Sequence, residues 1–305
     1  MKRFWFFTLS LMFVLAACAP QPSAAPTATA VPTPASPFDY NAKVPFDTKI
    51  ISQTEQSGVT ATELSYAAYD PSFATNTGGR TLATLVSPKG SGPFAGIVHM
   101  YGYDIFPTGS PKYLSEAITM ASHGAVTLLP ADYFPLGSLP MGTQADRPLI
   151  IGQVIELRRA FDFLLAQPGV DPQRLGYVGQ DIGGTYGGVL AGVDKRAKTY
   201  VLVAGWPSFL YMIRSYMENS SDQYLAYVQD IDPINFIPHA APASLFFQFA
   251  KNDELGLTES LANQYYAAAS QPKKIEWYDD THNLLSDPVV KARQAWLIEQ
   301  LGLTP

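Results

Sequence analysis

Residues 176–187 of the chain read GYVGQDIGGTYG. An apolar strand over 175–179 leads to one reactive side chain, and glycines then open a helix of small residues over 182–192. The nucleophile turn G-x-S-x-G has this outline, which exposes its central side chain where a strand meets a helix. Asp181 stands here in the place of the serine. The aspartate is either a catalytic group or a cap of its helix, because Asp is also a good N-cap residue.

The segments around this turn alternate between predicted strands and helices. Such an alternation predicts an α/β fold, in which helices cover both faces of a mainly parallel sheet. Apolar or β-branched runs predict strands, and apolar residues at helical spacing predict helices. The predicted strands are 62–70, 81–87, 94–100, 125–130, 199–204, 245–250 and 274–278, and the other predicted helices are 113–123, 150–166, 260–270 and 287–301.

The alternation breaks between residues 205 and 242, a segment rich in aromatic residues. Two interpretations are open. The segment forms a small cap over the carboxyl edge of the sheet, or it forms one long crossover helix whose aromatic side chains simply pack. The cap interpretation places Trp206, Tyr211 and Tyr216 beside the substrate.

The N-terminal segment has the features of an export signal. Lys2 and Arg3 precede an apolar run that is too short to span a membrane comfortably, and the run ends in LAAC at Cys18. This end resembles a bacterial lipoprotein signal, which implies that residues 1–17 are removed and Cys18 is lipidated. Two acyl chains suffice for stable membrane attachment. The alternative is an ordinary secretory signal with a chance cysteine; in both cases the protein is expected outside the cytoplasm.

Residues 18–37 contain the cysteine followed by a run of Pro, Ala and Thr, which cannot bury a core and predicts a disordered linker. The folded domain is expected over 38–305. Cys18 is the only cysteine, so no disulfide framework can form.

Composition excludes several classes of function. The chain has 15% charged residues, a net charge of −6 and no basic run, which argues against a nucleic-acid partner. It has no H-E-x-x-H metal motif and no glycine-rich phosphate loop that ends in Lys-Ser/Thr. We therefore expect no cofactor and no metal, and the expected partners are a small-molecule substrate and a membrane reached through the lipid anchor.

Three polar residues follow predicted strands. Asp181 follows 175–179, Asp253 follows 245–250, and His282 follows 274–278. Because ligands bind at the carboxyl ends of strands in an open α/β sheet, we expect these side chains to meet there. Their order, nucleophile then acid then histidine, is that of a catalytic triad. Glu254 is a competing candidate for the acid.

Four stretches carry a resemblance to a known family: RLGYVGQDIGG, LAGVDKRAKTYVLVAG, FQFAKND and WYDDTHNL. With them the chain, over roughly residues 81–303, resembles the α/β-hydrolase superfamily, in particular its dienelactone-hydrolase-like branch. The resemblance implies that Asp181 is the nucleophile, Asp253 the acid and His282 the base. That branch usually has Cys or Ser at the elbow, whereas an aspartate there resembles haloalkane dehalogenases and epoxide hydrolases.

An aspartate is chemically reasonable at this turn. The N-terminus of a helix favours an anion, so Asp181 should be ionised and need no base to activate it. His282 would then deprotonate the water of a second step, while Asp253 holds the imidazole tautomer. The backbone N–H of Ile182, with one from Tyr101 or Gly102, would form the oxyanion hole.

The type of bond cleaved stays open from sequence. A carboxylate attacks saturated carbon well, which favours alkyl halides or epoxides, whereas the dienelactone-hydrolase-like branch favours esters and lactones. Asp181 could instead act as a base on water. Trp206 is a candidate halide ligand, and Tyr211 and Tyr216 are candidates to polarise an epoxide. A non-catalytic binding protein on the same fold is the remaining alternative.

Overall fold

The computed structural model of the chain describes residues 1, 36–56, 58–71, 77–101, 111–130, 140–217 and 221–305. Across these residues one sheet contains nine strands in the order β1-β2-β3-β5-β4-β6-β7-β8-β9. The first three pairings, β1 with β2, β2 with β3 and β3 with β5, are antiparallel, and all others are parallel. The strands are β1 Lys49–Gln56, β2 Val59–Ala67, β3 Arg80–Pro88, β4 Phe94–Met100, β5 Ala125–Pro130, β6 Val170–Gln180, β7 Ala197–Val203, β8 Ser244–Ala250 and β9 Lys273–Tyr278.

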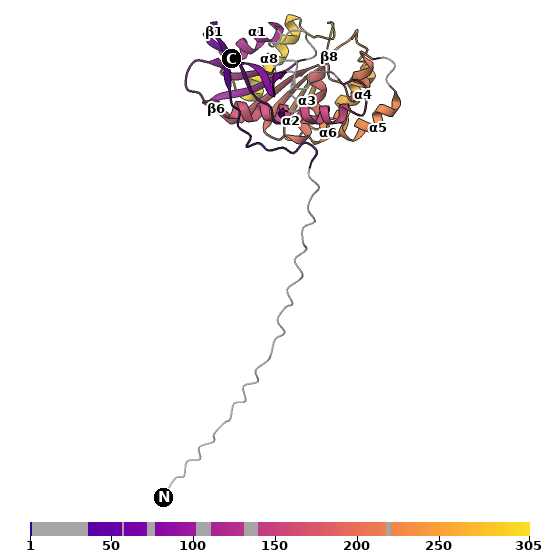
Figure 1. Cartoon of the computed structure of the whole chain (residues 1–305), viewed down its shortest axis with the longest axis horizontal. Coiled ribbons are helices and arrows are strands. Elements are labelled where there is room, and N and C mark those ends of the chain that lie inside the picture. Colours follow the sequence, from indigo (N-terminus) through magenta and orange to yellow (C-terminus); the bar gives the residue numbers. More distant parts are fainter. Residues whose placement is uncertain (2–35, 57, 72–76, 102–110, 131–139, 218–220) are drawn as a thin grey trace. The chain divides into compact units, whose positions relative to one another are not determined.

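The central parallel strands form the core because both of their faces are covered, whereas the edge strand β9 is only partly buried. Every residue of β8, SLFFQFA, is buried, as expected for a continuous apolar run. Helices α2 (Asp146–Leu165) and α3 (Ile182–Val193) pack against β4 and β6, while α1 (Pro111–Ser122) and α8 (Asp287–Leu301) contact each other and pack on β5 and β7. Figure 1 shows these two helical layers on opposite sides of the sheet. Helix α7 (Glu259–Ala268) connects β8 to β9.

Strand β1 is the element that the sequence pattern missed. All of its residues are exposed, including Ile50 and Ile51. A strand without a buried face has no reason to alternate apolar and polar residues, so KIISQTEQ carries no strand pattern. Its neighbour β2 does alternate in part, and that strand was predicted.

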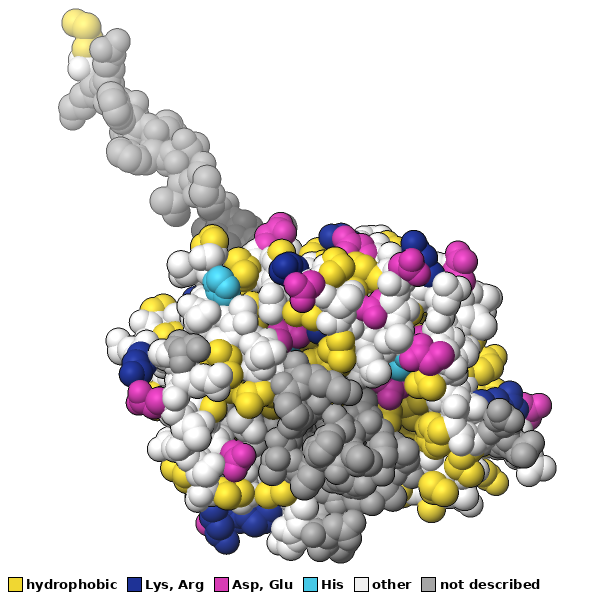
Figure 2. Space-filling model, turned by 90° about the horizontal axis from the view of Figure 1, so that it is seen from above, with side chains coloured by type: hydrophobic (Ala, Val, Ile, Leu, Met, Phe, Trp, Pro, Cys, Tyr) yellow, Lys and Arg dark blue, Asp and Glu magenta, His cyan; other side chains and the backbone are white. Residues whose placement is uncertain are grey.

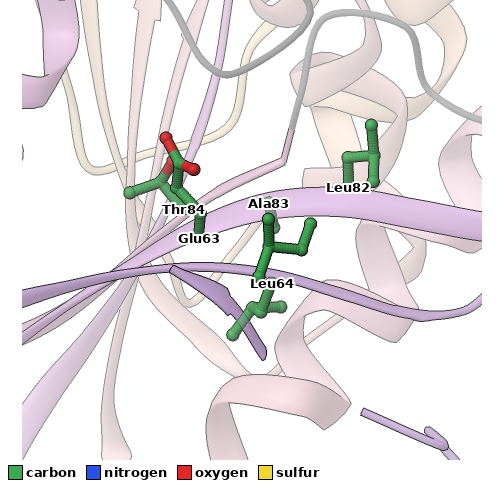
Figure 3. Close-up of a pocket in the computed structure, with 6 residues that line it drawn as sticks. Glu63, Leu64, Leu82, Ala83 and Thr84 are labelled. Carbon is green, nitrogen blue, oxygen red and sulfur yellow. The ribbon is translucent and has the colours of Figure 1, made fainter. Parts of the chain in front are cut away.

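A small cavity of about 50 Å³ lies over the first three strands. Figure 3 shows Glu63, Leu64, Leu82, Ala83 and Thr84 lining it, and Ile51 completes the lining. None of the residues predicted for the active site takes part in it, so this cavity is not the substrate site.

The segment 205–242 between β7 and β8 is not one long crossover helix. Its described residues form short helices and 3-10 turns, α4 Phe209–Arg214, η3 Asp222–Tyr224, α5 Leu225–Val228, η4 Gln229–Ile231, α6 Pro233–Phe236 and η5 Ile237–His239. Two of them, α6 and η5, pack against α3, the helix that begins directly after Asp181. The chain therefore returns from β7 to β8 across the outer side of α3.

Apart from Met1, the predicted signal peptide lies outside the described residues, and so do Cys18 and most of the predicted linker over 18–37. From Ser36 to Pro305 the chain forms one compact unit. Of the described helices, none combines the length and the apolar character that a membrane span requires.

Candidate active site

The turn between β6 and α3, where the sequence predicts the nucleophile, has a strained backbone. Asp181 has φ 55° and ψ −111°, a backbone conformation that non-glycine residues rarely adopt. Such strain costs about 1–3 kcal/mol and persists only where the surrounding structure enforces it. Two hydrogen bonds enforce it here: Asp181 N donates to Val203 O at 2.8 Å, and Thr185 N donates to Asp181 O at 2.9 Å.

The glycines of the elbow allow three backbone segments to approach closely. A Cβ atom on Gly179 would lie 2.2 Å from the carbonyl oxygen of Gly183, and one on Gly183 would lie 2.2 Å from that of Met100. Met100 is the last residue of β4. The start of α3 therefore lies directly against the carboxyl end of β4, with no room for a side chain.

The Asp181 side chain faces His282 and does not cap its own helix. Asp181 occupies the N-cap position of α3, yet its carboxylate makes no capping hydrogen bond. Its Oδ1 atom lies 3.2 Å from Nε2 of His282, and 17% of the side chain is exposed to solvent. Of the two roles open from sequence, the geometry therefore excludes the capping role.

The other ring nitrogen of His282 is bound to Asp253. The Nδ1 atom lies 2.6 Å from Oδ2 of Asp253, whose side chain is 2% exposed. The second carboxylate oxygen, Oδ1, accepts a hydrogen bond from Leu255 N at 2.9 Å. Asp253 is thus fixed in the loop after β8 and fixes the imidazole in turn. The structure brings together the three residues predicted as the catalytic set.

Glu254, the competing acid, has a different place. Its Oε2 atom accepts a hydrogen bond from the backbone N–H of His282 at 2.8 Å, so it does not contact the ring. The two neighbouring carboxylates therefore hold the same histidine at two points, Asp253 at the imidazole and Glu254 at the main chain. Sequence alone could not distinguish these roles, since both residues follow the same strand.

The environment of His282 favours its protonated form. Burial alone would lower the pKa of the imidazole, but the hydrogen bonds and charges of Asp181 and Asp253 outweigh burial and raise this pKa to about 10. This raised pKa favours an imidazolium at neutral pH. The ring nitrogen that would carry the added proton is Nε2, which lies 3.2 Å from Oδ1 of Asp181, because Nδ1 is bound to Asp253.

Two of the three residues predicted for the oxyanion hole, Ile182 and Tyr101, lie near the turn at Asp181. Ile182 is the first residue of α3 and is buried, and Tyr101 directly follows β4. The contact between Gly183 and Met100 places the backbone around Tyr101 beside the elbow. Gly102 lies outside the described residues. The first residue after Asp181 and the end of β4 are thus neighbours, as the predicted oxyanion hole of two backbone N–H groups requires.

The three aromatic residues predicted for the pocket differ in their surroundings. Trp206 is buried with its ring 6.4 Å from that of His282, and its Nε1 has no hydrogen-bond partner among the described residues. Tyr216 donates its hydroxyl proton to Pro140 O at 2.7 Å, and burial, Asp146 and Asp181 together raise its pKa. Tyr211 lies on α4 and is 39% exposed. Trp206 therefore lies beside His282, and the charge of Asp181 contributes to the raised pKa of Tyr216.

Thr185 is a site residue that the sequence did not single out. Its hydroxyl donates to Asp181 O at 2.9 Å and accepts from Trp206 N at 3.0 Å. It thereby joins the elbow to the start of the segment 205–242. A threonine one turn into a helix has no distinctive pattern, so only the spatial arrangement shows this role.

No group of His, Cys, Asp and Glu side chains within the described part of the chain could hold a metal ion. Figure 2 shows acidic and basic side chains interspersed over one face of the molecule. The described residues of that face form no continuous basic area of the kind that a nucleic acid would need.

Solved structures similar to this chain share the α/β-hydrolase fold. The acetyl xylan esterase from Paenibacillus sp. R4 is 18% identical, with a TM-score of 0.62, and the match covers 84% of this chain and 89% of that one. Acetyl xylan esterase 1 from Thermoanaerobacterium sp. JW/SL YS485 is 14% identical, with a TM-score of 0.67 and coverage of 87% and 91%. A protein described as a dienelactone hydrolase from Klebsiella pneumoniae subsp. pneumoniae MGH 78578 is 15% identical, with a TM-score of 0.56 and coverage of 80% and 98%.

These similarities confirm the predicted fold class, and they include the branch that the sequence resembled. No protein-family model and no curated protein matches the chain. At identities this low the similarity establishes the fold, and the chemistry must be argued from the site itself.

Proposed function

We propose that this protein is an ester hydrolase in which Asp181 is the nucleophile. The proposal rests on the position of His282 between two carboxylates at the strained turn. Its Nε2 atom lies 3.2 Å from Oδ1 of Asp181, and its Nδ1 atom lies 2.6 Å from Oδ2 of Asp253. A side chain held in a costly backbone conformation and aimed at a buried imidazole is typical of a reacting group. The similar structures support ester cleavage in particular, because two of them are named acetyl xylan esterases.

The first step uses the proton that His282 already holds. A carboxylate oxygen of Asp181 attacks the ester carbonyl carbon, and the backbone N–H groups at Ile182 and near Tyr101 stabilise the oxyanion. The C–O bond to the alcohol breaks as Nε2–H of His282 donates its proton to the departing oxygen. The products are an alcohol, a mixed anhydride on Asp181 and a neutral imidazole. A basic alkoxide therefore never has to leave unprotonated.

The second step restores the site. Neutral His282 takes a proton from water, and the resulting hydroxide attacks the acyl carbon of the anhydride. The acid is released, Asp181 is again a carboxylate and His282 is again an imidazolium. Asp253 accepts the Nδ1 hydrogen bond throughout, so the proton always moves at Nε2. The sum is one ester and one water converted to one acid and one alcohol.

The alternative substrates differ in whether their leaving group needs the proton of His282. A halide leaves without a proton, so a site that starts with an imidazolium provides nothing that carbon–halide cleavage needs. Epoxide opening produces an alkoxide, which does need a proton. Epoxide hydrolysis with a covalent Asp181 ester is therefore the second candidate, and it is favoured by the same charge state of His282.

The proposal is tested by hydrolysis assays on one substrate of each class. The purified domain is offered p-nitrophenyl acetate, ethyl acetate, acetylated xylan, a lactone, a haloalkane and an epoxide, with Asp181→Asn as the control. Ester turnover that the variant lacks supports the proposal. Turnover of the epoxide alone would select the second candidate, and a folded protein inert on all of them would favour a non-catalytic binding protein.

We also propose that the protein is an extracytoplasmic lipoprotein, anchored through Cys18. The support is the sequence alone: a short apolar run that ends in LAAC before a Pro-, Ala- and Thr-rich segment. Incorporation of labelled palmitate into the full chain, but not into Cys18→Ser, is the expected result. Equal release of both proteins from membranes at high salt would contradict the anchor.

A further inference from the structure

A buried ion pair joins helix α1 to helix α8. The Arg293 guanidinium donates from Nε to both carboxylate oxygens of Glu116 at 3.0 Å, and from Nη2 to Oε2 at 2.8 Å. The Arg293 and Glu116 side chains are 1% and 2% exposed. Both charges are withdrawn from water and are satisfied mainly by each other, as a buried charge requires.

The same guanidinium reaches the loop that carries His282. Its Nη1 atom donates to the carbonyl oxygen of Leu284 at 2.9 Å. Leu284 follows His282 by two residues, is fully buried and has φ 51°, the left-handed region that favours glycine. A leucine stays in this conformation only where its surroundings enforce it. Arg293 therefore holds the strained turn that leads out of the catalytic histidine.

The pair also contacts the oxyanion side of the site through α1. The Arg293 guanidinium lies 6.0 Å from the centre of the Tyr113 ring, one turn before Glu116 on the same helix. The Tyr113 ring stacks on that of Tyr101, with centroids 3.6 Å apart and planes at 12°. Tyr101 directly follows β4, next to the elbow. The Arg293 guanidinium thus contacts the loop that carries His282 and also Tyr113, the residue that packs against Tyr101 after β4.

We propose that Glu116 and Arg293 are positioning residues that set His282 against Asp181 and the oxyanion segment. An apolar pair of similar size would often stabilise the fold as well as a buried ion pair does. It could not supply a directed hydrogen bond to Leu284 O. The inference rests on the proposed function in one respect, that His282 transfers its proton at Nε2. Neither residue touches the reacting atoms.

The test replaces both charges together, since a single replacement would leave its partner buried and unpaired. In the double variant Arg293→Met with Glu116→Leu, kcat for p-nitrophenyl acetate should fall about 10- to 100-fold, because a displacement of about 1 Å in a catalytic group has an effect of this size. KM should stay unchanged. The matched control is Lys291→Met, which alters an exposed residue of the same helix and should keep the wild-type kcat.

A readout independent of turnover separates this inference from the proposed function. The Nδ1 proton of His282, hydrogen-bonded to Asp253, should give a far-downfield proton NMR resonance in the wild type and a shifted one in the double variant. This comparison holds even if the wild type hydrolyses no ester. If the double variant does not fold, Arg293→Lys replaces it, since a lysine keeps the charge but lacks the guanidinium fork. A folded variant with wild-type kcat and an unshifted resonance would overturn the inference.

Discussion

The Nε2 atom of His282 lies 3.2 Å from Oδ1 of Asp181, so the residue in the place of a serine faces the histidine and leaves its own helix uncapped. In a serine site the nucleophile starts with a proton, and the histidine removes it. In the proposed mechanism the nucleophile is a carboxylate with no proton to remove, and the histidine carries the proton from the start. The histidine therefore first donates a proton to the leaving alcohol and then takes a proton from water. A serine site adds a proton transfer from the serine before these two.

Asp181→Asn should abolish hydrolysis, with a loss of at least about a thousandfold in kcat, because the amide keeps the shape but removes the attacking oxygen anion. The fold should persist, since the side chain is partly exposed and caps nothing. Ester hydrolysis and thermal unfolding measured on the same preparation check both points. An active Asp181→Asn would exclude Asp181 as the nucleophile.

Asp181→Ser should restore a conventional triad with an opposite pH dependence. Removal of the Asp181 charge lowers the pKa of His282, so a neutral imidazole becomes available to deprotonate the serine. For the wild type acting on ethyl acetate, kcat/KM should fall as pH rises through about 10, where His282 loses its proton. For the serine variant it should rise through the lowered pKa. Two pH profiles of the same slope would contradict this account.

The stability of the wild type should also depend on the protonation of His282. Its pKa is raised from 6.5 to about 10 in the folded state, so the folded protein binds this proton more tightly than the unfolded chain does. The resulting stabilisation is complete below pH 6.5 and is lost as pH rises through about 10. The urea midpoint should decline over this window in the wild type, and less so in His282→Gln, which is the control.

Asp253→Asn should lower kcat by about 10⁴, because the amide can present an N–H to Nδ1 and reverse the tautomer that the mechanism needs. Glu254→Gln is the matched control. Its side chain binds only the backbone of His282, and glutamine can still accept that hydrogen bond. A loss below about tenfold is expected for Glu254→Gln. Equal losses in the two variants would show that the carboxylates share one role.

Gly183→Ala should damage the site through the backbone. The new Cβ would lie 2.2 Å from Met100 O, so α3 and β4 must move apart. Overpacking of this kind costs about 1–3 kcal/mol, and it would separate the two halves of the oxyanion hole. The value of kcat should fall by more than the fraction of protein that is unfolded at the assay temperature, as judged from the lowered melting temperature. Wild-type kcat in a folded Gly183→Ala would place the oxyanion hole elsewhere.

The core of the fold could be predicted from sequence because its strands are buried on both faces. Runs such as SLFFQFA in β8 are typical of strands buried on both faces, and the order of strands and helices then indicates where Asp181, Asp253 and His282 meet. Strand β1 could not be predicted, since none of its residues is buried and its place depends on pairing with β2.

The supporting residues of the site could not be predicted for a related reason. Glu116 and Arg293 lie on helices where charged residues are expected to face water, and only the packing of α1 on α8 turns them inward. Glu254 and Asp253 follow the same strand, and their roles separate only in three dimensions. The protonated state of His282 likewise depends on two carboxylates that are far apart in sequence.

The most direct test of Asp181 as the nucleophile is rapid-quench mass spectrometry of His282→Gln after mixing with p-nitrophenyl acetate. This leaving group needs no acid, so the first step should proceed, while the second step lacks its base and slows. If Asp181 is the nucleophile, the variant releases a burst of p-nitrophenol equal to the enzyme present, and the peptide that contains Asp181 gains one acetyl group. Rapid turnover by the wild type with no acetylated Asp181 in either protein would contradict this role of Asp181.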